Sequence, residues 1–346
     1  MHISDPDFYS EIYHLKAHRT HRDKFYNLEI LGPGLAFTTN HEVHARRRAP
    51  LAPYFSMQSI QVLVPRITSL VHQMNQHLRD AVAAGTVIHA NHLFTAFAMD
   101  VIAEYSLGEE GTTGSLKRPN FGKWWYDLTQ KQVQMNAFFR HFPLVARAMI
   151  SLPDALAVKA MPALENFIWW QANLRAQVKA VLETNEKGNV PSTPTVIHAL
   201  AASKLPPSDK TVVRLAAEAN LLLGAGAETT AATISRTTYH ILANPDVLKR
   251  LQEELVAAMP VAHEMPSLSK LNQLPYLNAV IEEGLRTALP VLSRSPRVFQ
   301  NHALKYKDWV IPPGVSLTIL QCSLFHTIPY SLSSLSPYTF SLTYPW

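Results

Sequence analysis

Small, acidic and hydroxyl-bearing residues interrupt an apolar segment near the middle of the chain. Ala225-Gly226-Ala227-Glu228-Thr229-Thr230 directly follows Leu221-Leu222-Leu223. On a helix, Gly226, Thr229 and Thr233 share one face, because residues three or four apart are neighbours. A glycine in a helix interior costs about 1 kcal/mol relative to alanine. A helix that tolerates this cost, and carries hydroxyls on the same side, suggests a flat molecule lying against it.

Positively charged residues form a second group with helical spacing. His44 and Arg48 lie four residues apart, and Arg46-Arg47 between them completes a compact cationic cluster. Arginine pairs well with carboxylates, so this cluster could clamp an anionic ligand. Arg294 and Arg297, just before or within an expected strand, could supply a second donor to the same anion.

Each of these patterns also has a plainer interpretation. Glu283 and Arg286, three apart on one helix, can be a solvent-exposed ion pair. The stretch His44–Arg48 can be a solvated helix end. The segment around Gly226 can be a core helix whose small residues allow close packing. A dinucleotide-binding Gly-x-Gly-x-x-Gly motif fits poorly, because Thr229 occupies the third glycine position and helix formers precede the motif.

Most of the elements that would position these residues are helices. Apolar residues recur at helical spacing from about Lys210 to about Leu242, which predicts one long helix around the central segment. Asn40 can cap a helix that carries His44 and Arg48. Further helices are expected over 60–84, 91–107, 121–185 with breaks at the prolines 143, 153 and 162, 195–204, 245–259 and from 275 to before 290. Short strands are expected at 297–299, 309–311 and 315–320, so the fold class is mainly α with a small β portion.

The composition is that of a globular chain with a large core. Of 346 residues, 47% are hydrophobic and 16% are charged, a balance that excludes a disordered chain. The net charge is +5, but no broad basic face is evident, so nucleic acid is not expected as a partner. A single cysteine, Cys322, excludes an intramolecular disulfide and a multi-cysteine metal site. Neither a signal peptide nor a run of about 20 apolar residues is present.

The order and spacing of these motifs resemble the cytochrome P-450 superfamily, the haem-thiolate monooxygenases. Ala225–Thr230 looks like the oxygen-activating helix motif of the family, in which Gly, an acid and Thr stand in this order. Glu283-x-x-Arg286 looks like the helix pair of the family, and it follows Thr229 by 54 residues (283 − 229). His44-x-x-x-Arg48 stands where the family usually has Trp-x-x-x-Arg. The resemblance covers about residues 1–328.

The resemblance implies a cytochrome P-450 fold and a haem cofactor (iron protoporphyrin IX). Arg48, and with it His44 and Arg297, would bind the haem propionates. Thr229 and Glu228 would lie over the distal face and help deliver protons to bound oxygen. Ala225 and Gly226 would leave room for oxygen and substrate between the helix and the haem.

The resemblance also implies partners and a place in the cell. Asp5-Pro6-Asp7-Phe8-Tyr9 and the His-x-x-x-Arg variant look most like fungal enzymes of secondary metabolism. The implied reaction is monooxygenation of an apolar small molecule with molecular oxygen and a cytochrome reductase. The full-length family is expected at the endoplasmic reticulum membrane, although this chain has no transmembrane segment. Glu283 and Arg286 would form a buried structural pair without a catalytic role.

The C-terminal end of the sequence departs from the family. The iron ligand of the family is a cysteine in a Phe-x-x-Gly-x-Arg-x-Cys-x-Gly loop, and the 60 residues after Arg286 (346 − 286) contain no such loop. Cys322 lacks the Gly and Arg context, so it is expected to be a structural thiol and not the iron ligand. We expect a single partial domain over 1–328, lacking the N-terminal anchor as well, and an unrelated low-complexity tail over 329–346.

Two alternatives to an active monooxygenase follow. The chain could be a non-catalytic, truncated remnant of such an enzyme, because the cysteine loop is absent. It could also be a helical interaction module unrelated to haem proteins. That alternative would leave the order and spacing of the motifs unexplained.

Overall fold

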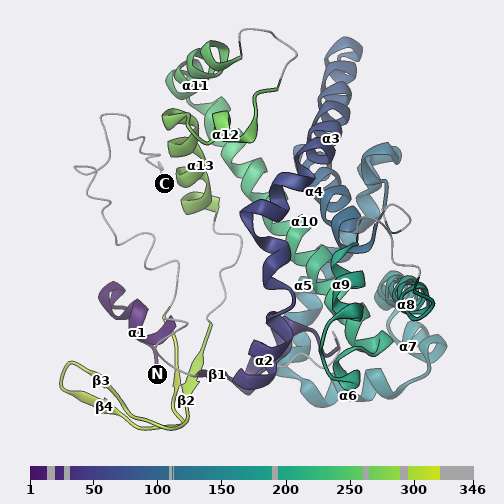
Figure 1. Cartoon of the computed structure of the whole chain (residues 1–346), viewed down its shortest axis with the longest axis vertical. Helices are drawn as coiled ribbons and strands as arrows, with labels where there is room; N and C mark the ends of the chain where they lie inside the picture. The colour runs from purple at the N-terminus through teal and green to yellow at the C-terminus, as the bar shows by residue number, and fades with distance from the viewer. Residues whose placement is uncertain are drawn as a thin grey trace.

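A single long helix, α10 (Val212–Ala243), runs through the middle of the molecule (Figure 1). The structure is a computed structural model that describes residues 1–13, 20–26, 32–108, 111, 113–188, 194–259, 265–288 and 295–319. Thr211 caps α10, since its Oγ1 accepts a hydrogen bond from the backbone N–H of Arg214 at 3.3 Å. The prediction of one helix from about Lys210 to about Leu242 is confirmed.

The remaining helices surround α10 on one side and extend it at one end (Figure 1). Helices α2 to α9 form the larger body, whereas α11 to α13 lie beside the C-terminal end of α10. Their bounds are α1 Tyr9–Tyr13, α2 His41–Arg48, α3 Met57–Ala84, α4 Ala90–Leu107, α5 Lys123–His141, α6 Pro143–Ser151, α7 Asp154–Ala160, α8 Glu165–Glu186, α9 Val196–Ala202, α11 Pro245–Ala258, α12 Leu268–Leu271 and α13 Pro275–Ala288.

Local sequence signals set several of these helix ends. Asn40 caps α2, because its Oδ1 accepts a hydrogen bond from the Val43 backbone N–H at 2.9 Å. Helix α3 ends at Gly85, whose φ of 63° is a left-handed conformation that favours glycine. Pro245 and Pro275 begin α11 and α13, as expected for a residue that needs no N–H partner in the first turn.

The small β portion lies at the edge of the molecule next to α1, and its strand β1 contacts α2 of the main helical body (Figure 1). Strands β1 (Thr20–Arg22), β2 (Arg297–Phe299) and β5 (Ser316–Leu317) form one antiparallel sheet, with β2 in the centre. Strands β3 (Leu304–Tyr306) and β4 (Trp309–Ile311) form a separate hairpin. The strands at 297–299, at 309–311 and within 315–320 are confirmed, whereas β1 and β3 were not predicted.

The main hydrophobic core joins α10 to α4, α8 and α9. Its fully buried members include Met99 and Ala103 on α4, Leu174 and Val178 on α8, Ile197 on α9, and Leu215 and Leu223 on α10. Helices α10 and α13 approach each other at Gly284, where an added Cβ would lie 2.2 Å from Oγ1 of Thr237. Close backbone approach therefore explains the glycine between Glu283 and Arg286.

Within the described residues, no helix combines the length and the apolar character needed to cross a membrane. The tail at 329–346, the end of the proposed domain at 328, and Cys322 lie outside the described residues.

Candidate functional site

The central segment of α10 presents one side that the described residues leave uncovered. Every residue from Arg214 to Asn220 is buried, but Ala225 and Ala232, which are seven residues apart and so share one side of the helix, are exposed. The hydroxyl of Thr229 lies at this region and donates a hydrogen bond to the backbone carbonyl of Ala225 at 2.7 Å. Because the Thr229 hydroxyl donates its hydrogen to this carbonyl, the direction of its O–H bond is fixed. The lone pairs of its oxygen remain available to accept a hydrogen bond.

The carboxylate of Glu228 is held by α5, on another side of α10. The amide Nε2 of Gln130 donates to Glu228 Oε1 at 2.5 Å, and the hydroxyl of Thr129 donates to Oε2 at 3.1 Å. Burial raises the pKa of Glu228, and the hydrogen bonds from Thr129 and Gln130 oppose that shift only in part. A raised pKa brings the titration of this carboxyl group closer to neutral pH, where it could both release and take up a proton.

Gly226 has a packing role that the sequence did not reveal. A Cβ added there would lie 2.8 Å from Cγ1 of Ile102 on α4, so the helices would have to move apart. Close packing of α10 against α4 thus accounts for a glycine at this position, and the interpretation of a helix wall thinned for oxygen and substrate stays a prediction. At Gly224, by contrast, an added Cβ would meet nothing within 4 Å. A contact between Gly226 and a cofactor stays a prediction.

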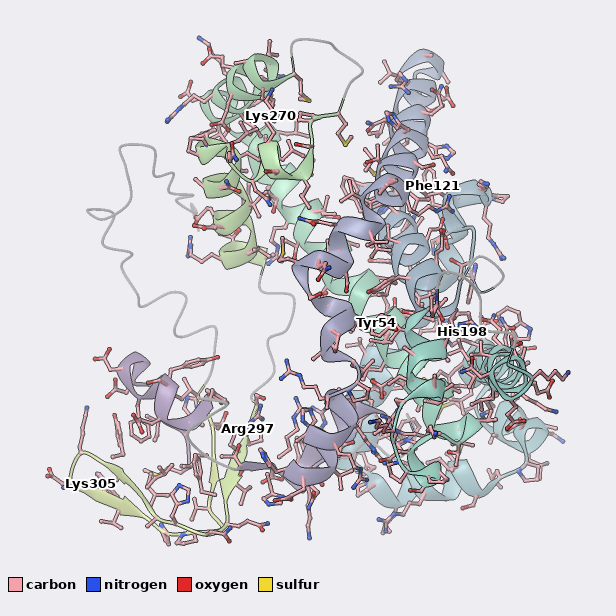
Figure 2. All side chains as sticks on the ribbon, viewed as in Figure 1. Tyr54, Phe121, His198, Lys270, Arg297 and Lys305 are labelled. Carbon is pink, nitrogen blue, oxygen red and sulfur yellow. The ribbon has the colours of Figure 1, made fainter. Side chains whose placement is uncertain are left out.

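A cationic cluster forms where α2 meets the β1–β2 sheet. His44 is half-buried, and its pKa falls to about 4, first because of burial and then because Arg22, Arg48, Arg297 and His41 surround it with positive charge. Arg22 and Arg297 are direct partners in the antiparallel register of β1 and β2. Figure 2 labels Arg297 at the part of the sheet that lies beside α2.

This cluster brings together three residues that the sequence analysis named far apart in the chain. His44, Arg48 and Arg297 act on one another electrostatically, and the structure adds Arg22 and His41. Like charges placed directly opposite each other on neighbouring strands are destabilising. The arrangement thus favours an anion that would lie among these groups, and carboxylates are suitable partners for arginine.

The neighbouring arginines of α2 have a different partner. Arg46 and Arg47 both bind the carboxylate of Asp209, with Nη2–Oδ distances of 2.8 Å in each case. The side chain of Asp209 is only 2% exposed, and the two arginines lower its pKa against the effect of burial. The expectation that Arg46 and Arg47 belong to the same cluster as His44 and Arg48 is wrong, because successive helix residues point about 100° apart.

Asp209 therefore fixes α2 to the chain that leads into α10. Arg47 also donates to the hydroxyl of Thr38 at 2.9 Å and to the carbonyl of Pro33 at 3.2 Å. These bonds hold one side of α2 while His44 and Arg48 occupy the other. Sequence reasoning missed Asp209, and the only available signal was an acid next to two prolines at the start of a helix.

Glu283 and Arg286 form the pair that their spacing predicts. Arg286 donates from Nε to Oε2 and from Nη2 to Oε1 of Glu283, both at 2.6 Å. The two side chains are 13% and 24% exposed, respectively, so the fully solvated alternative does not hold. A bidentate, partly buried pair of this kind orders the helix that carries it.

Two of the named residues cannot be placed. Cys322 and Arg294 lie outside the described residues. The structure therefore neither supports nor opposes their predicted roles.

The fold and these residues fit the class of haem proteins. The flat ring of a haem suits the uncovered side of α10, and its two propionate carboxylates suit the cationic cluster. Arg48, His44, Arg297 and Arg22 form a suitable cationic site for such carboxylates. A family model described as cytochrome P450 matches residues 1–327. The chain belongs to the cytochrome P450 family, whose cofactor is haem.

Curated relatives agree with this assignment. The chain is 35% identical to "Cytochrome P450 monooxygenase orf6" of Eupenicillium brefeldianum over 318 residues, which are 91% of this chain and 62% of the relative. It is 32% identical to "Fusicoccadiene C-8 hydroxylase" of Alternaria brassicicola over 329 residues, 90% of this chain and 61% of the relative. It is 33% identical to "Cytochrome P450 monooxygenase tndB" of Aspergillus flavipes, covering 72% of that protein. The chain thus spans about three fifths of the length of the first two.

Proposed function

We propose that this chain is the greater part of a haem-dependent monooxygenase that oxidises an apolar small molecule in fungal secondary metabolism. The observation that carries the proposal is the convergence of Arg22, His44, Arg48 and Arg297 from separate parts of the chain. Membership of the cytochrome P450 family identifies the carboxylate-bearing cofactor that this cluster suits. Relatives described as monooxygenases and as a hydroxylase support the reaction class.

In this proposal, one group of residues binds the cofactor and a second group transfers protons. Arg48, His44 and Arg297 would bind the haem propionates through charge-assisted hydrogen bonds. Haem, when bound, supplies the redox-active iron at which molecular oxygen is reduced and one oxygen atom passes to the substrate. Glu228, with its raised pKa, would exchange protons with solvent, and the Thr229 hydroxyl would orient the last proton donor.

The partners follow from the same proposal. A cytochrome reductase would supply electrons, and the substrate would be an apolar molecule that lies against the uncovered side of α10 at Ala225 and Thr229. Attachment of the full-length protein to the endoplasmic reticulum membrane is proposed from the family alone. No described helix of this chain is long and apolar enough to cross a membrane.

The non-catalytic remnant remains the second candidate. Its specific motivation is that the single cysteine, Cys322, has no Gly or Arg context. Such a chain would keep the cationic cluster and could bind haem without turning over a substrate.

Titration of the purified chain with haem tests the proposal. We expect a stoichiometric Soret band, and about tenfold weaker binding for Arg48→Gln and Arg297→Gln, because each loses a charge-assisted hydrogen bond. Arg79→Gln, on the exposed end of α3, is the matched control and should bind as the wild type does. Failure to bind haem at all would overturn the proposal. Binding without product formation in the presence of a reductase would favour the remnant.

A further inference from the structure

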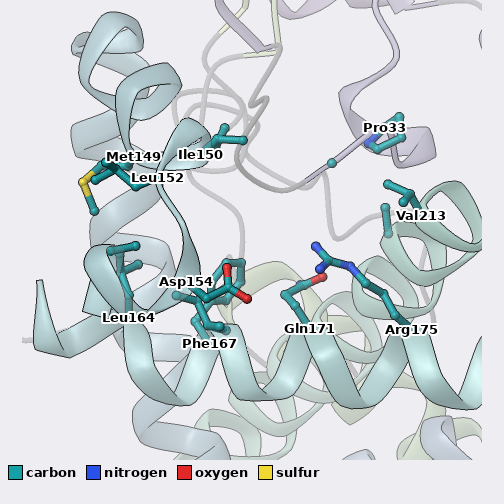
Figure 3. Close-up of a pocket in the computed structure, with 14 residues that line it drawn as sticks. Pro33, Met149, Ile150, Leu152, Asp154, Leu164, Phe167, Gln171, Arg175 and Val213 are labelled. Atoms are coloured by element: carbon teal, nitrogen blue, oxygen red, sulfur yellow. The ribbon is translucent and has the colours of Figure 1, made fainter. Parts of the chain in front are cut away.

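A cavity of about 320 Å³ lies near the start of α10, where Val213 lines it (Figure 3). It is enclosed by the α6–α7 segment, one face of α8, the first turns of α10 and the loop at Gly32-Pro33. This volume is at the lower end of the range for small-molecule sites in proteins. The apolar part of its wall consists of Met149, Ile150, Leu152, Leu164, Phe167 and Val213.

Several of these apolar side chains are exposed and would gain from a ligand. Ile150 is 51% exposed, and Leu152 and Val213 are 37% and 54% exposed. They come from α6, from the loop after it, and from α10, yet they line the same cavity. An apolar body placed in the cavity would remove their surfaces from water.

Two polar side chains of α8, Gln171 and Arg175, line this cavity. Nε2 of Gln171 is buried and has no hydrogen-bond partner within the described residues. A buried donor without a partner carries a desolvation cost that an acceptor on a ligand would remove. Arg175, one turn further along α8, also lines the cavity, and no ion pair or hydrogen bond of its guanidinium occurs among the described residues. Figure 3 shows the guanidinium directed toward the amide of Gln171.

Asp154 also lines this cavity and limits what can bind there. It is exposed, and it forms no ion pair with Arg175 within the part of the chain described by the structure. A ligand with one carboxylate can contact Arg175 and Gln171 and leave Asp154 in water. A ligand with a second carboxylate would bring like charges together at Asp154, which disfavours it.

The cavity is separate from the acid and hydroxyl of α10. Its α10 residues are Val213 and Ala217, and Thr229 lies twelve residues beyond Ala217, which is about 18 Å along a helix. The cavity is also separate from the His44 cluster, since none of the residues of that cluster lines it.

We propose that this cavity is a second small-molecule site, which binds an apolar monocarboxylic acid. The carboxylate accepts hydrogen bonds from Arg175 and Gln171 Nε2, and the hydrocarbon body covers Ile150, Leu152 and Val213. The site goes beyond the proposed monooxygenase function and does not require haem, so its failure and the failure of that function are separately measurable.

Calorimetric titration of the purified chain with decanoate, without haem and at neutral pH, tests the site. We expect one decanoate per chain, with at least tenfold weaker binding of decan-1-ol and of the dicarboxylate decanedioate. Arg175→Gln and Gln171→Leu should each weaken decanoate binding about tenfold. Each substitution removes a hydrogen bond to the charged carboxylate, and such bonds contribute more to the binding free energy than neutral ones. Decan-1-ol should bind these two variants as weakly as it binds the wild type.

Two control variants locate the bound acid. Lys179→Gln lies one turn beyond Arg175 on α8, where Lys179 is 69% exposed and pairs with Glu183, and it should bind decanoate as the wild type does. Arg48→Gln tests the other cationic site of the molecule and should also leave decanoate binding unchanged. The proposal is overturned by the absence of binding, by equal binding of acid and alcohol, or by a loss in Arg48→Gln that Arg175→Gln does not share.

Discussion

Two glutamates of α10, ten residues apart, have opposite environments. Glu218 is fully buried and pairs with Arg214 one turn earlier, at an Nη1–Oε2 distance of 2.5 Å. It also accepts a hydrogen bond from the backbone N–H of Leu35 at 3.1 Å, which ties the loop at Gly34 to the helix. Glu228 is only partly buried, and its partners Thr129 and Gln130 are neutral.

The difference separates an acid that maintains the fold from one that can change its charge. A carboxylate paired with a buried guanidinium is needed in its ionised form, since either partner alone would be a buried, uncompensated charge. Neutral donors solvate the ionised form of Glu228 only in part, and burial keeps its pKa above the ordinary value. Along one helix, Glu218 thus has the environment of a structural acid, whereas Glu228 has the environment that the proposed proton-exchanging role requires.

Glu218→Gln should have the largest effect. It leaves the Arg214 guanidinium buried without a counter-charge, and breaking a buried pair in this way costs about 3–5 kcal/mol of unfolding free energy. Urea-induced unfolding measures the loss. The exposed Glu186→Gln on α8 is the control and should change stability by less than about 0.5 kcal/mol. A stable Glu218→Gln variant would show that the pair contributes no more than its exposed counterparts.

Glu228→Gln should leave stability almost unchanged and reduce turnover, in contrast to Glu218→Gln. Because the folded-state pKa of Glu228 is raised, its ionised form costs stability as the pH rises through its unfolded value. The neutral amide removes that cost, so the variant should be as stable as the wild type at neutral pH, or slightly more stable. Turnover of the proposed monooxygenase should fall about 100-fold, which is typical for loss of a positioned proton donor.

Stability and product formation of Glu228→Gln are therefore measured together with those of Glu218→Gln. A large stability loss in Glu228→Gln with unchanged turnover per folded molecule would reverse the assignment of the two acids.

The helices were predictable from the sequence, because their signals are local. The stripe of apolar residues, the Thr211 cap and the Pro245 start lie within or next to the elements that they define. Strand β1 was not predictable, since Thr20–Arg22 pairs with Arg297–Phe299, far away in the chain. Three residues contain too little pattern to identify so distant a partner.

The site was predictable where charge and spacing mark it. His44, Arg48 and Arg297 were named as donors to an anion from their residue types, the resemblance identified that anion as a haem propionate, and the structure brings the three residues together. Thr129, Gln130 and Asp209 were missed, because a hydrogen-bond partner on another helix leaves no mark on the local sequence. The contact of Gly226 with Ile102 was not predictable for the same reason, because Ile102 lies on another helix, α4.

Gln130→Leu tests the neutral environment of Glu228 directly. Its amide stabilises the ionised carboxylate, so removing this donor should raise the pKa of Glu228 further. The carboxyl stretching band in infrared spectra, assigned with Glu228→Gln, follows the ionisation as a function of pH. The control is Gln134→Leu, since Gln134 is exposed one turn further along α5. An unchanged midpoint in Gln130→Leu would mean that burial alone sets this pKa.

The smallest effect concerns His44, a half-buried titratable group whose neighbours are cations instead of neutral donors. Its pKa is about 4 in the folded chain, against an ordinary value of 6.5, so the unfolded chain binds more protons between these values. Stability should therefore fall as the pH falls from about 6.5 toward 4, by roughly 1–2 kcal/mol after allowance for solvent screening. Urea unfolding at several pH values should show a shallower decline in His44→Gln than in the wild type or in the exposed control His72→Gln. Bound haem should also reduce the decline, since its propionates would offset the positive charge of Arg22, Arg48 and Arg297. Equal slopes in wild type and His44→Gln would mean that His44 is not held in its neutral form by this cluster.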